Sequence, residues 1–317
     1  AMEQIIAIVG PTAVGKTALS FHLADHYGTE LISGDAYQIY RHMDIGTAKP
    51  TAAELLRFRH HLIDIAEPGE AYSAARFCAM AGDVAHALQR QGKVPVLVGG
   101  TGLYVQSFLE GFTFDGSAVD EAARTAARER IAAMGEAELI AYIRQQTEWE
   151  APDWHELVSN EHRLVRLMVA IEKGEGRTFV RSGKDRTLAW PAYVIGLSLP
   201  RPVLYERIET RIDVMLEEGW VEEVECLLAA GVDPACQAMK AIGYAELTAY
   251  VHGELTLDEA AATIKTRTRH FAKRQLTWFK RMPYIHWFAK EEYDSEDALA
   301  RAVLTETDAW LARTERP

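Results

Sequence analysis

The sequence predicts an α/β fold in which helices flank a parallel β-sheet and a mostly helical insertion domain interrupts it. Two observations lead to this expectation. Short β-branched apolar runs alternate with amphipathic helical patterns, which is typical of a parallel sheet with helices on both faces. A long stretch without any strand pattern then separates the fourth run from the fifth. The expected strands cover residues 4–9, 30–33, 61–65, 94–98, 193–199 and 284–288.

The chain is therefore expected to divide into two domains. Residues 1–115 and 192–317 would form the core with the C-terminal helices. Residues 116–191 would form the insertion, because this stretch is rich in Ala, Glu and Arg at helical spacing. From residue 202 onward the pattern is mostly helical, with a long helix expected over residues 257–280. A chain of 317 residues with 48% apolar side chains can bury one large core or two modest ones.

Composition argues against several classes of protein. The longest apolar runs are far shorter than the roughly 18 residues that a membrane span needs, so no transmembrane helix is expected. Cys78, Cys226 and Cys236 show no C-x-x-C spacing, so neither a disulfide framework nor a zinc ribbon is predicted. These observations favour a protein of the reducing cytoplasm, and a monomer is the favoured state.

The strongest functional signal is a phosphate-binding loop between the first expected strand and a helix over residues 18–27. Its pattern, G-x-x-x-x-G-K-S/T, is the P-loop of nucleotide-binding proteins. The glycines let successive N–H groups point at phosphate oxygens, at the positive end of the helix. Lys16 adds a charge and Thr17 a hydroxyl for Mg²⁺, but the pattern leaves open whether ATP or another diphosphate binds. The loop consists of Gly10, Pro11, Thr12, Ala13, Val14, Gly15, Lys16 and Thr17.

Further candidate residues follow the strands at the carboxyl edge of the sheet, where open α/β sheets bind ligands. Asp35 ends the second expected strand, where a carboxylate accepts a proton, holds a metal through water or caps a helix. Thr101 lies among the glycines of residues 99–104, which suit either a close approach to a ligand or a tight turn. Arg207 and Arg211, one helical turn apart, either reach a diphosphate or face solvent.

The distribution of charge matters more than the net charge of −12, which by itself argues against a nucleic-acid partner. Residues 260–289 contain no Asp or Glu. On the long expected helix, Ile264, Phe271 and Trp278 share a face that should pack on the core. Another face is basic, which fits either a phosphate-backbone contact or a solvated surface. The cations of this segment are Lys265, Arg267, Arg269, Lys273, Arg274, Lys280 and Arg281, and His270 lies among them.

Taken together, five segments resemble the bacterial tRNA dimethylallyltransferases. They are residues 10–17, 32–35, 38–50, 99–104 and 272–279, and the string MDIGTAKP at residues 43–50 is the most specific. The likeness covers nearly the whole chain, weakest in the insertion and after Phe288. It implies a P-loop NTPase-like fold. It also implies Mg²⁺-dependent transfer of a dimethylallyl (isopentenyl) group from dimethylallyl diphosphate to N6 of the adenosine 3′-adjacent to the anticodon in tRNA, with release of diphosphate.

The resemblance also implies roles for individual residues. The P-loop would hold the pyrophosphate of the donor, and Asp35 would be the general base. Thr101 and Arg211 would stabilise the leaving pyrophosphate. Ala36 stands where the family commonly has Ser. The expected contacts to the anticodon stem-loop of tRNA, including three from the basic helix, are Asp35, Ala36, Tyr37, Gln38, Thr101, Arg124, Asn160, Arg163, Arg267, Lys273 and Arg274.

Two other functions remain open at this point. A P-loop kinase for a small molecule would share Lys16, Thr17 and Asp35, but it gives no reason for residues 43–50. A noncatalytic RNA-binding protein that uses a nucleotide as a switch would not need both Asp35 and Thr101 beside the P-loop.

Overall fold

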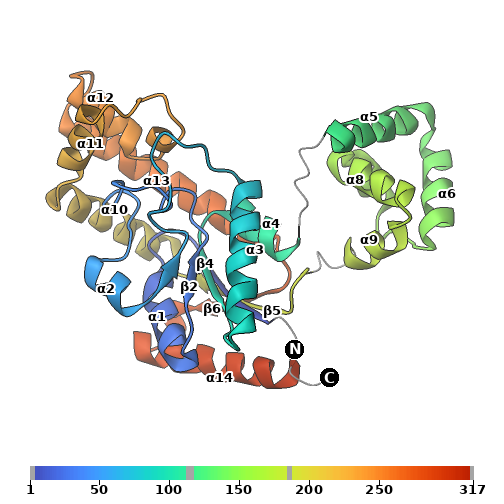
Figure 1. The fold of residues 1–317 in the computed structure, drawn as a ribbon, viewed down its shortest axis with the longest axis horizontal. Helices are drawn as coiled ribbons and strands as arrows, with labels where there is room; N and C mark the ends of the chain where they lie inside the picture. The colour runs from blue at the N-terminus through green and yellow to red at the C-terminus, as the bar shows by residue number, and fades with distance from the viewer. Residues whose placement is uncertain (1–3, 112–117, 184–187, 315–317) are drawn as a thin grey trace. The chain divides into compact units, whose positions relative to one another are not determined.

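The computed structural model describes residues 4–111, 118–183 and 188–314, and the remaining residues lie outside this description (Figure 1). The chain divides into two compact units. One unit comprises Ala1–Gly111 and Ala189–Pro317, and the other comprises Phe112–Leu188. None of the helices in the described ranges is long and apolar enough to cross a membrane.

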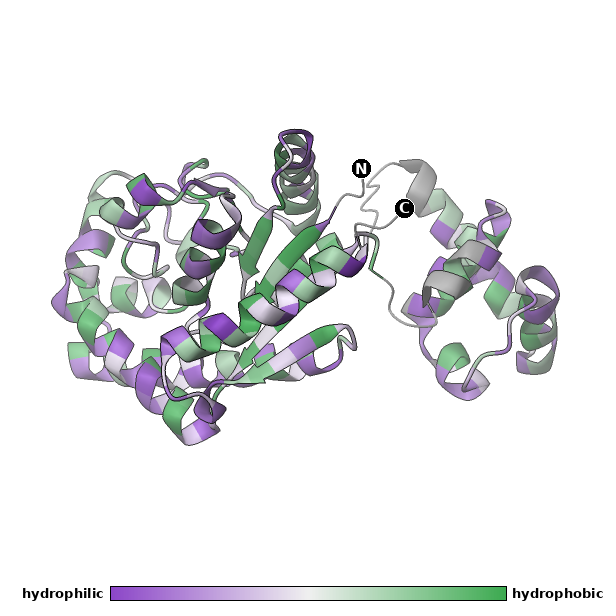
Figure 2. Ribbon diagram, turned by 90° about the horizontal axis from the view of Figure 1, so that it is seen from below, coloured by the Kyte–Doolittle hydropathy of each residue, from purple (hydrophilic) through white to green (hydrophobic). Residues whose placement is uncertain are grey.

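A six-stranded parallel sheet forms the centre of the first unit, with the strand order β3-β2-β4-β1-β5-β6. Strand β1 is buried along its whole length, because it pairs with a strand on each side and lies beneath helices. Figure 2 shows the hydrophobic strands in the middle of this unit, with helices on either side. The strands are β1 (Ile5–Val9), β2 (Leu31–Ser33), β3 (His60–His61), β4 (Val96–Gly99), β5 (Ala192–Ser198) and β6 (Ile285–Ala289).

The prediction of a strand over residues 61–65 is wrong, since only His60–His61 pairs with β2. Leu62 and Asp64 have φ angles of 66° and 57°. These left-handed conformations turn the chain and end the strand. The turn carries Asp64 back toward the segment that follows β2, where Ile39 accepts backbone hydrogen bonds from Ile65 and Ala66.

Helices cover both faces of the sheet, and α13 is the longest of those that the structure describes (Figure 1). Thr256 and Glu259 form a capping box that fixes its start. The helices of this unit are α1 (Lys16–Tyr27), α2 (Ala52–Arg57), α3 (Ala74–Arg90), α4 (Gly102–Leu109), α10 (Arg201–Glu217), α11 (Trp220–Ala229), α12 (Tyr244–Val251), α13 (Leu257–Lys280) and α14 (Glu296–Thr314), with 3₁₀ turns at Ala238–Lys240 and Lys290–Glu292.

The predicted core face of α13 is correct at one end and wrong at the other. Ile264 is fully buried, whereas Phe271 is only partly buried and Trp278 is 37% exposed. Seven residues of an α-helix fall about 20° short of two full turns. A stripe taken every seven residues therefore rotates away from the core, and the buried residues near the C-terminus are Ala272, Gln275 and Phe279.

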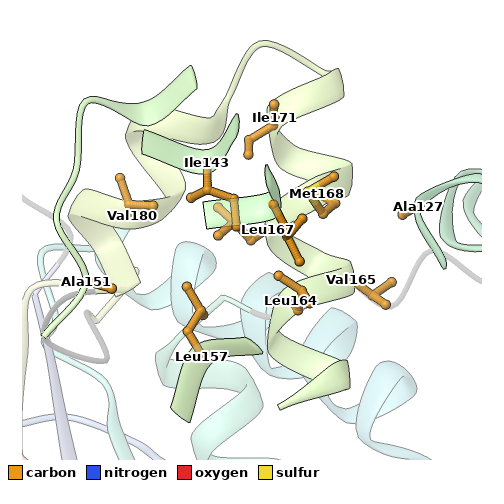
Figure 3. Close-up of a cluster of buried hydrophobic side chains, with 11 residues drawn as sticks. Ala127, Ile143, Ala151, Leu157, Leu164, Val165, Leu167, Met168, Ile171 and Val180 are labelled. Carbon is orange, nitrogen blue, oxygen red and sulfur yellow. The ribbon is translucent and has the colours of Figure 1, made fainter. Parts of the chain in front are cut away.

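The second unit is a small helical bundle with its own core (Figure 3). Leu164, Val165, Leu167, Met168 and Ile171 form the apolar stripe of α8, which packs against buried side chains from the other four helices. The helices are α5 (Ala118–Ala133), α6 (Glu136–Thr147), α7 (Trp154–Ser159), α8 (Glu161–Glu172) and α9 (Gly176–Gly183). All of them lie within the range expected for the insertion.

Candidate active site

The P-loop joins the end of β1 to the N-terminus of α1. Gly10 and Gly15 have φ angles of 154° and 104°, which L side chains rarely adopt. Space is also limited at both positions. A Cβ at Gly10 would lie 2.9 Å from the carbonyl oxygen of Leu197, and a Cβ at Gly15 would lie 2.5 Å from Lys290 Nζ. The backbone conformation therefore requires both glycines of the pattern, and the neighbouring backbone of Leu197 also requires Gly10.

Three cations hold the carbonyl groups of this loop. Lys16 Nζ donates to the carbonyl oxygens of Gly10 and Pro11, at 2.8 and 2.9 Å. Arg207 Nε donates to Ala13, and Lys290 Nζ donates to Val14, each at 2.9 Å. The first N–H groups of α1 have no partner within the helix, as at any helix N-terminus. This arrangement fixes the loop in a conformation suited to an anion.

Lys16, Asp35 and Arg211 line one cavity of about 820 Å³ at the carboxyl edge of the sheet. Burial, together with the charge of the nearby Arg211, lowers the pKa of Lys16 to about 7, while Asp35 opposes the change. Burial also lowers the pKa of Arg211, with a contribution from Arg207. Two cations thus share a poorly solvated wall, and an anion bound there would stabilise both.

Asp35 is oriented by the backbone that follows it. Its Oδ1 accepts the N–H groups of Tyr37 and Gln38, at 2.7 and 3.0 Å. Burial raises the pKa of Asp35, whereas these two hydrogen bonds and the positive charges of Lys16 and Arg211 oppose the rise. The carboxylate therefore combines a fixed orientation with increased basicity.

Thr101 does not line this cavity. Its Oγ1 accepts the N–H of Ala36 at 3.1 Å, so the hydroxyl links the loop after β4 to the loop after β2. Ala36 supplies only its backbone to this link, as Ser would. Tyr37 is partly buried beside these residues, and Gln38 forms part of the cavity wall.

Residues 43–50, whose chemistry the spacing did not reveal, supply another part of the cavity wall through Thr47, Ala48 and Pro50. A carboxylate from α11 holds this loop. Glu223 Oε1 accepts the N–H groups of Asp44 and Ile45, at 2.8 and 2.9 Å. The loop therefore depends on a partner far away in the sequence, and no local pattern identifies Glu223.

Two further side chains, those of Lys49 and Gln38, hold the same loop in place. Lys49 is almost completely buried and forms ion pairs with Asp44 at 2.8 Å and Asp64 at 2.5 Å. It also donates to the carbonyl oxygen of Tyr40. Gln38 Nε2 donates to the carbonyl oxygen of Thr47 at 3.1 Å, which ties the loop to the segment of Asp35.

The expected contact residues of the insertion, Arg124, Asn160 and Arg163, belong to the second unit, whereas Asp35 belongs to the first. Asn160 caps α8, where its Oδ1 accepts the N–H of Arg163 at 3.1 Å. Arg124 and Arg163 are partly buried on α5 and α8. Asn160 thus has a structural role that the sequence pattern did not reveal.

The structure divides the basic segment of α13 into two halves. In the first half, Lys265 pairs with Asp213 at 2.8 Å, Arg267 with Glu246, and Arg269 with Glu209. In the second half, Lys273 and Arg274 are exposed, and no carboxylate of the described residues lies within 4 Å of either. These two cations border a surface groove lined by His270, Lys273, Arg274, Thr277, Trp278 and Arg281.

The fold and the cavity together define a P-loop protein of the α/β class with a site for a phosphate-type anion. The chain belongs to the IPP transferase family. The model of that family matches residues 38–282, and an isopentenyl transferase model matches residues 3–68.

Individual relatives extend this likeness over most of the chain. The tRNA dimethylallyltransferase of Bacillus pumilus is 41% identical over 289 residues, which cover 90% of this chain and 89% of the relative. The full-length tRNA isopentenylpyrophosphate transferase structure from Bacillus halodurans is 36% identical with a TM-score of 0.73, covering 99% of this chain and 100% of that one.

A second solved structure agrees with the first. The tRNA delta(2)-isopentenylpyrophosphate transferase from Staphylococcus epidermidis is 34% identical with a TM-score of 0.72, covering 96% of this chain and 99% of that one. The predicted fold, a P-loop NTPase-like parallel sheet flanked by helices, is therefore confirmed.

The anchoring of residues 43–50 leads to a prediction about stability. A Cβ at Gly46 would lie 2.3 Å from Trp220 Nε1 and 2.6 Å from the ring of Tyr244. We expect Gly46→Ala to lower the free energy of unfolding by about 1–3 kcal/mol through overpacking, as measured by urea denaturation. Gly69→Ala is the matched control, because nothing lies within 4 Å of a Cβ there. Equal effects of the two substitutions would contradict the steric explanation.

The lowered pKa of Lys16 leads to a prediction about anion binding. At pH 8 the amine is mostly neutral in the free protein, since its pKa is about 7. A bound anion favours the protonated form. We therefore expect inorganic diphosphate to bind with uptake of a proton, and its affinity to fall as the pH rises above 7.

Calorimetry in two buffers of different ionisation enthalpy measures this proton uptake at pH 8. Lys16→Met is the reference, because diphosphate itself also titrates and the difference between the two proteins isolates Lys16. The same proton uptake in both proteins would show that Lys16 does not respond to the anion.

Proposed function

We propose that this protein is a tRNA dimethylallyltransferase. It transfers a dimethylallyl group from dimethylallyl diphosphate to N6 of the adenosine 3′-adjacent to the anticodon, and it releases diphosphate. The observation that carries this proposal is the single cavity in which the P-loop, the partly buried cations Lys16 and Arg211, and the carboxylate of Asp35 meet. Membership of the IPP transferase family and relatives named for this reaction support it.

The cations of the cavity match the charge that develops on the leaving group. Breaking the allylic C–O bond leaves negative charge on the pyrophosphate. The N–H groups of the P-loop, Lys16 and Arg211 would stabilise this charge where it forms, without reorganisation during the reaction. Thr101 supports the same region indirectly through its hydrogen bond to the Ala36 peptide.

Asp35 is the proposed general base. An adenine amine is a weak nucleophile, and removal of its proton as the new C–N bond forms lowers the barrier. The N–H groups of Tyr37 and Gln38 hold the carboxylate in place, and burial raises its pKa. The adenine has to leave its stack in the anticodon loop to reach this carboxylate.

Mg²⁺ is the proposed cofactor, and the residues present fit it. Thr17 lies in the first turn of α1 and contributes to the cavity wall, so its hydroxyl would be one ligand. The structure describes no cluster of three or more His, Cys, Asp or Glu side chains that could hold a metal. The remaining ligands would come from diphosphate and water, as Mg²⁺ commonly prefers. When bound, the ion supplies positive charge beside the diphosphate.

The second half of the basic segment on α13 is the proposed contact surface for the anticodon stem-loop in the first unit. No carboxylate of the part of the chain that the structure describes competes for Lys273 and Arg274, so they are available to phosphates. Arg267 is held by Glu246, which is itself almost completely buried, and we assign it to that ion pair instead. In the helical unit, Arg124, Asn160 and Arg163 are the proposed contacts. The protein would act as a cytoplasmic monomer.

The kinase alternative has less support. A kinase accounts for the P-loop and for Asp35, but not for the buried ion pairs and hydrogen bonds that hold residues 43–50 at the cavity. A relative that is 41% identical over 90% of the chain is named as a tRNA dimethylallyltransferase.

The proposal is tested with purified protein, Mg²⁺, radiolabelled dimethylallyl diphosphate and an unmodified anticodon stem-loop that carries adenosine 3′ of the anticodon. AMP serves as a parallel acceptor. Label in the RNA alone is the expected result. Label in AMP would indicate a transferase for free nucleotides, and label in neither would favour the kinase and an assay of ATP consumption.

The role of Asp35 gives a prediction in the same assay. Asp35→Asn keeps the size of the side chain but removes the base. We expect kcat to fall about 10²- to 10⁴-fold, while the Kd for the stem-loop changes less than about threefold. Asp83→Asn, at an exposed position on α3, is the matched control. Turnover that survives in the Asp35 variant would exclude the carboxylate as the base.

The division of the basic segment gives a second prediction. We expect the double substitution Lys273→Ala/Arg274→Ala to raise the Kd for the stem-loop about tenfold or more at moderate salt. The slope of log Kd against log salt should fall by about two, one for each lost phosphate contact. Lys265→Ala/Arg269→Ala removes the same charge from ion-paired positions and should have a smaller effect. Equal losses in both variants would show that only net charge matters.

A further inference from the structure

Gln275 joins two loops of the cavity that belong to different strands. Its Oε1 accepts the N–H of Thr12 in the P-loop at 2.9 Å, and its Nε2 donates to the carbonyl oxygen of Gly100 after β4 at 2.7 Å. The side chain is only 5% exposed and lines the cavity. A donor on one side and an acceptor on the other fix the orientation of the amide, because reversing it would break both hydrogen bonds.

The loop after β4 is packed closely against this amide. A Cβ at Gly100 would lie 2.6 Å from Gln275 Nε2 and 3.3 Å from Lys16 Nζ. A Cβ at Gly102 would lie 2.5 Å from Cδ1 of Trp278, three residues further along α13. Glycine is therefore required at both positions, since α13 rests directly on the backbone of this loop.

The contacts continue from Gln275 to the general base. Gly100 precedes Thr101, whose hydroxyl accepts the N–H of Ala36. Ala36 follows Asp35 directly. The Oε1 end of Gln275 thus contacts the P-loop, which is proposed to hold the pyrophosphate. The Nε2 end contacts Gly100, which is connected through Thr101 and Ala36 to the backbone beside the Asp35 carboxylate.

Transfer of the prenyl group depends on the distance between these two places. The P-loop would set the position of the electrophilic carbon through the pyrophosphate, and Asp35 would set the position of the attacking nitrogen. A misplacement of about 1 Å between reacting groups costs on the order of 100-fold in rate.

We propose that Gln275 is a positioning residue that keeps the P-loop and the loop of Asp35 at the separation needed for transfer. This inference rests on the proposed function. Gln275 acts through the Thr12 and Gly100 peptides, so its loss should affect the chemical step more than the binding of either substrate.

Gln275→Met tests this role, because Met has a similar length and shape but makes neither hydrogen bond. We expect kcat to fall about 10- to 100-fold. The Kd values for inorganic diphosphate and for the stem-loop should change less than about threefold. Gln237→Met is the matched control. Gln237 also bridges a backbone, with an N–H from Tyr72 at 3.2 Å and a bond to the Tyr72 carbonyl at 2.6 Å, but it lies outside the cavity.

Gln275→Glu separates positioning from packing. When ionised, this side chain still accepts the N–H of Thr12 but cannot donate to Gly100. When protonated, it can make both bonds. Burial raises the pKa of a carboxyl group, so the ratio of variant to wild-type kcat should rise as the pH falls. Taking the ratio removes the titration that the two proteins share. The other titratable and charged groups that face this cavity are Lys16, Asp35, Glu54, His60, Glu206, Arg207 and Arg211.

The outcomes distinguish the inference from the proposed function. A wild-type protein that transfers no label would overturn both. With an active wild type, a normal kcat in Gln275→Met would overturn the positioning role alone. So would a parallel loss of kcat, diphosphate binding and melting temperature, or a pH-independent ratio in Gln275→Glu, because each indicates a purely structural residue.

Discussion

The partial burial of two cations beside each other is the constraint on which the site depends. Lys16 and Arg211 line the same cavity wall, with Asp35 as the nearby anion that partly offsets their repulsion. Removing charges from water is unfavourable unless partners compensate. The carbonyl oxygens of Gly10 and Pro11 compensate Lys16 only in part, because its pKa still falls to about 7. The folded protein therefore holds a place prepared for an anion, which is what stabilisation of a leaving group requires.

The strand order brings the parts of this site together. Strands β2, β4 and β1 are neighbours in the sheet, so Asp35, the glycine loop and the P-loop emerge at one edge. Strand β5, on the other side of β1, leads into α10, which carries Arg207 and Arg211. The fold thus places residues that are far apart in the sequence around one cavity, as the 194-residue separation of Arg207 and Ala13 and the 263-residue separation of Gln275 and Thr12 show.

The features that the sequence predicted are those with a local cause. The P-loop is defined by eight consecutive residues, and Asp35 by its place after an apolar run. Gln275 and Glu223 could not be assigned in this way, because their hydrogen-bond partners are far away in the sequence. Gln275 contacts Thr12, 263 residues away, and Glu223 contacts Asp44, 179 residues away. The same limit explains Trp278, because helical periodicity alone did not show which side of α13 is buried near its C-terminus. The early end of β3 depends on two left-handed residues that no glycine signals.

The basic segment of α13 shows why a charge pattern and a site should be distinguished. Three of its cations neutralise carboxylates of α10 and α12, so they stabilise the packing of the helix and leave little charge for a partner. Lys273 and Arg274, which remain exposed, immediately precede Gln275 in the same helix. RNA held by these two side chains would therefore rest on the element that contacts both the P-loop and the glycine loop. A rigid helix in this position would align the proposed acceptor with the proposed donor without a separate moving part.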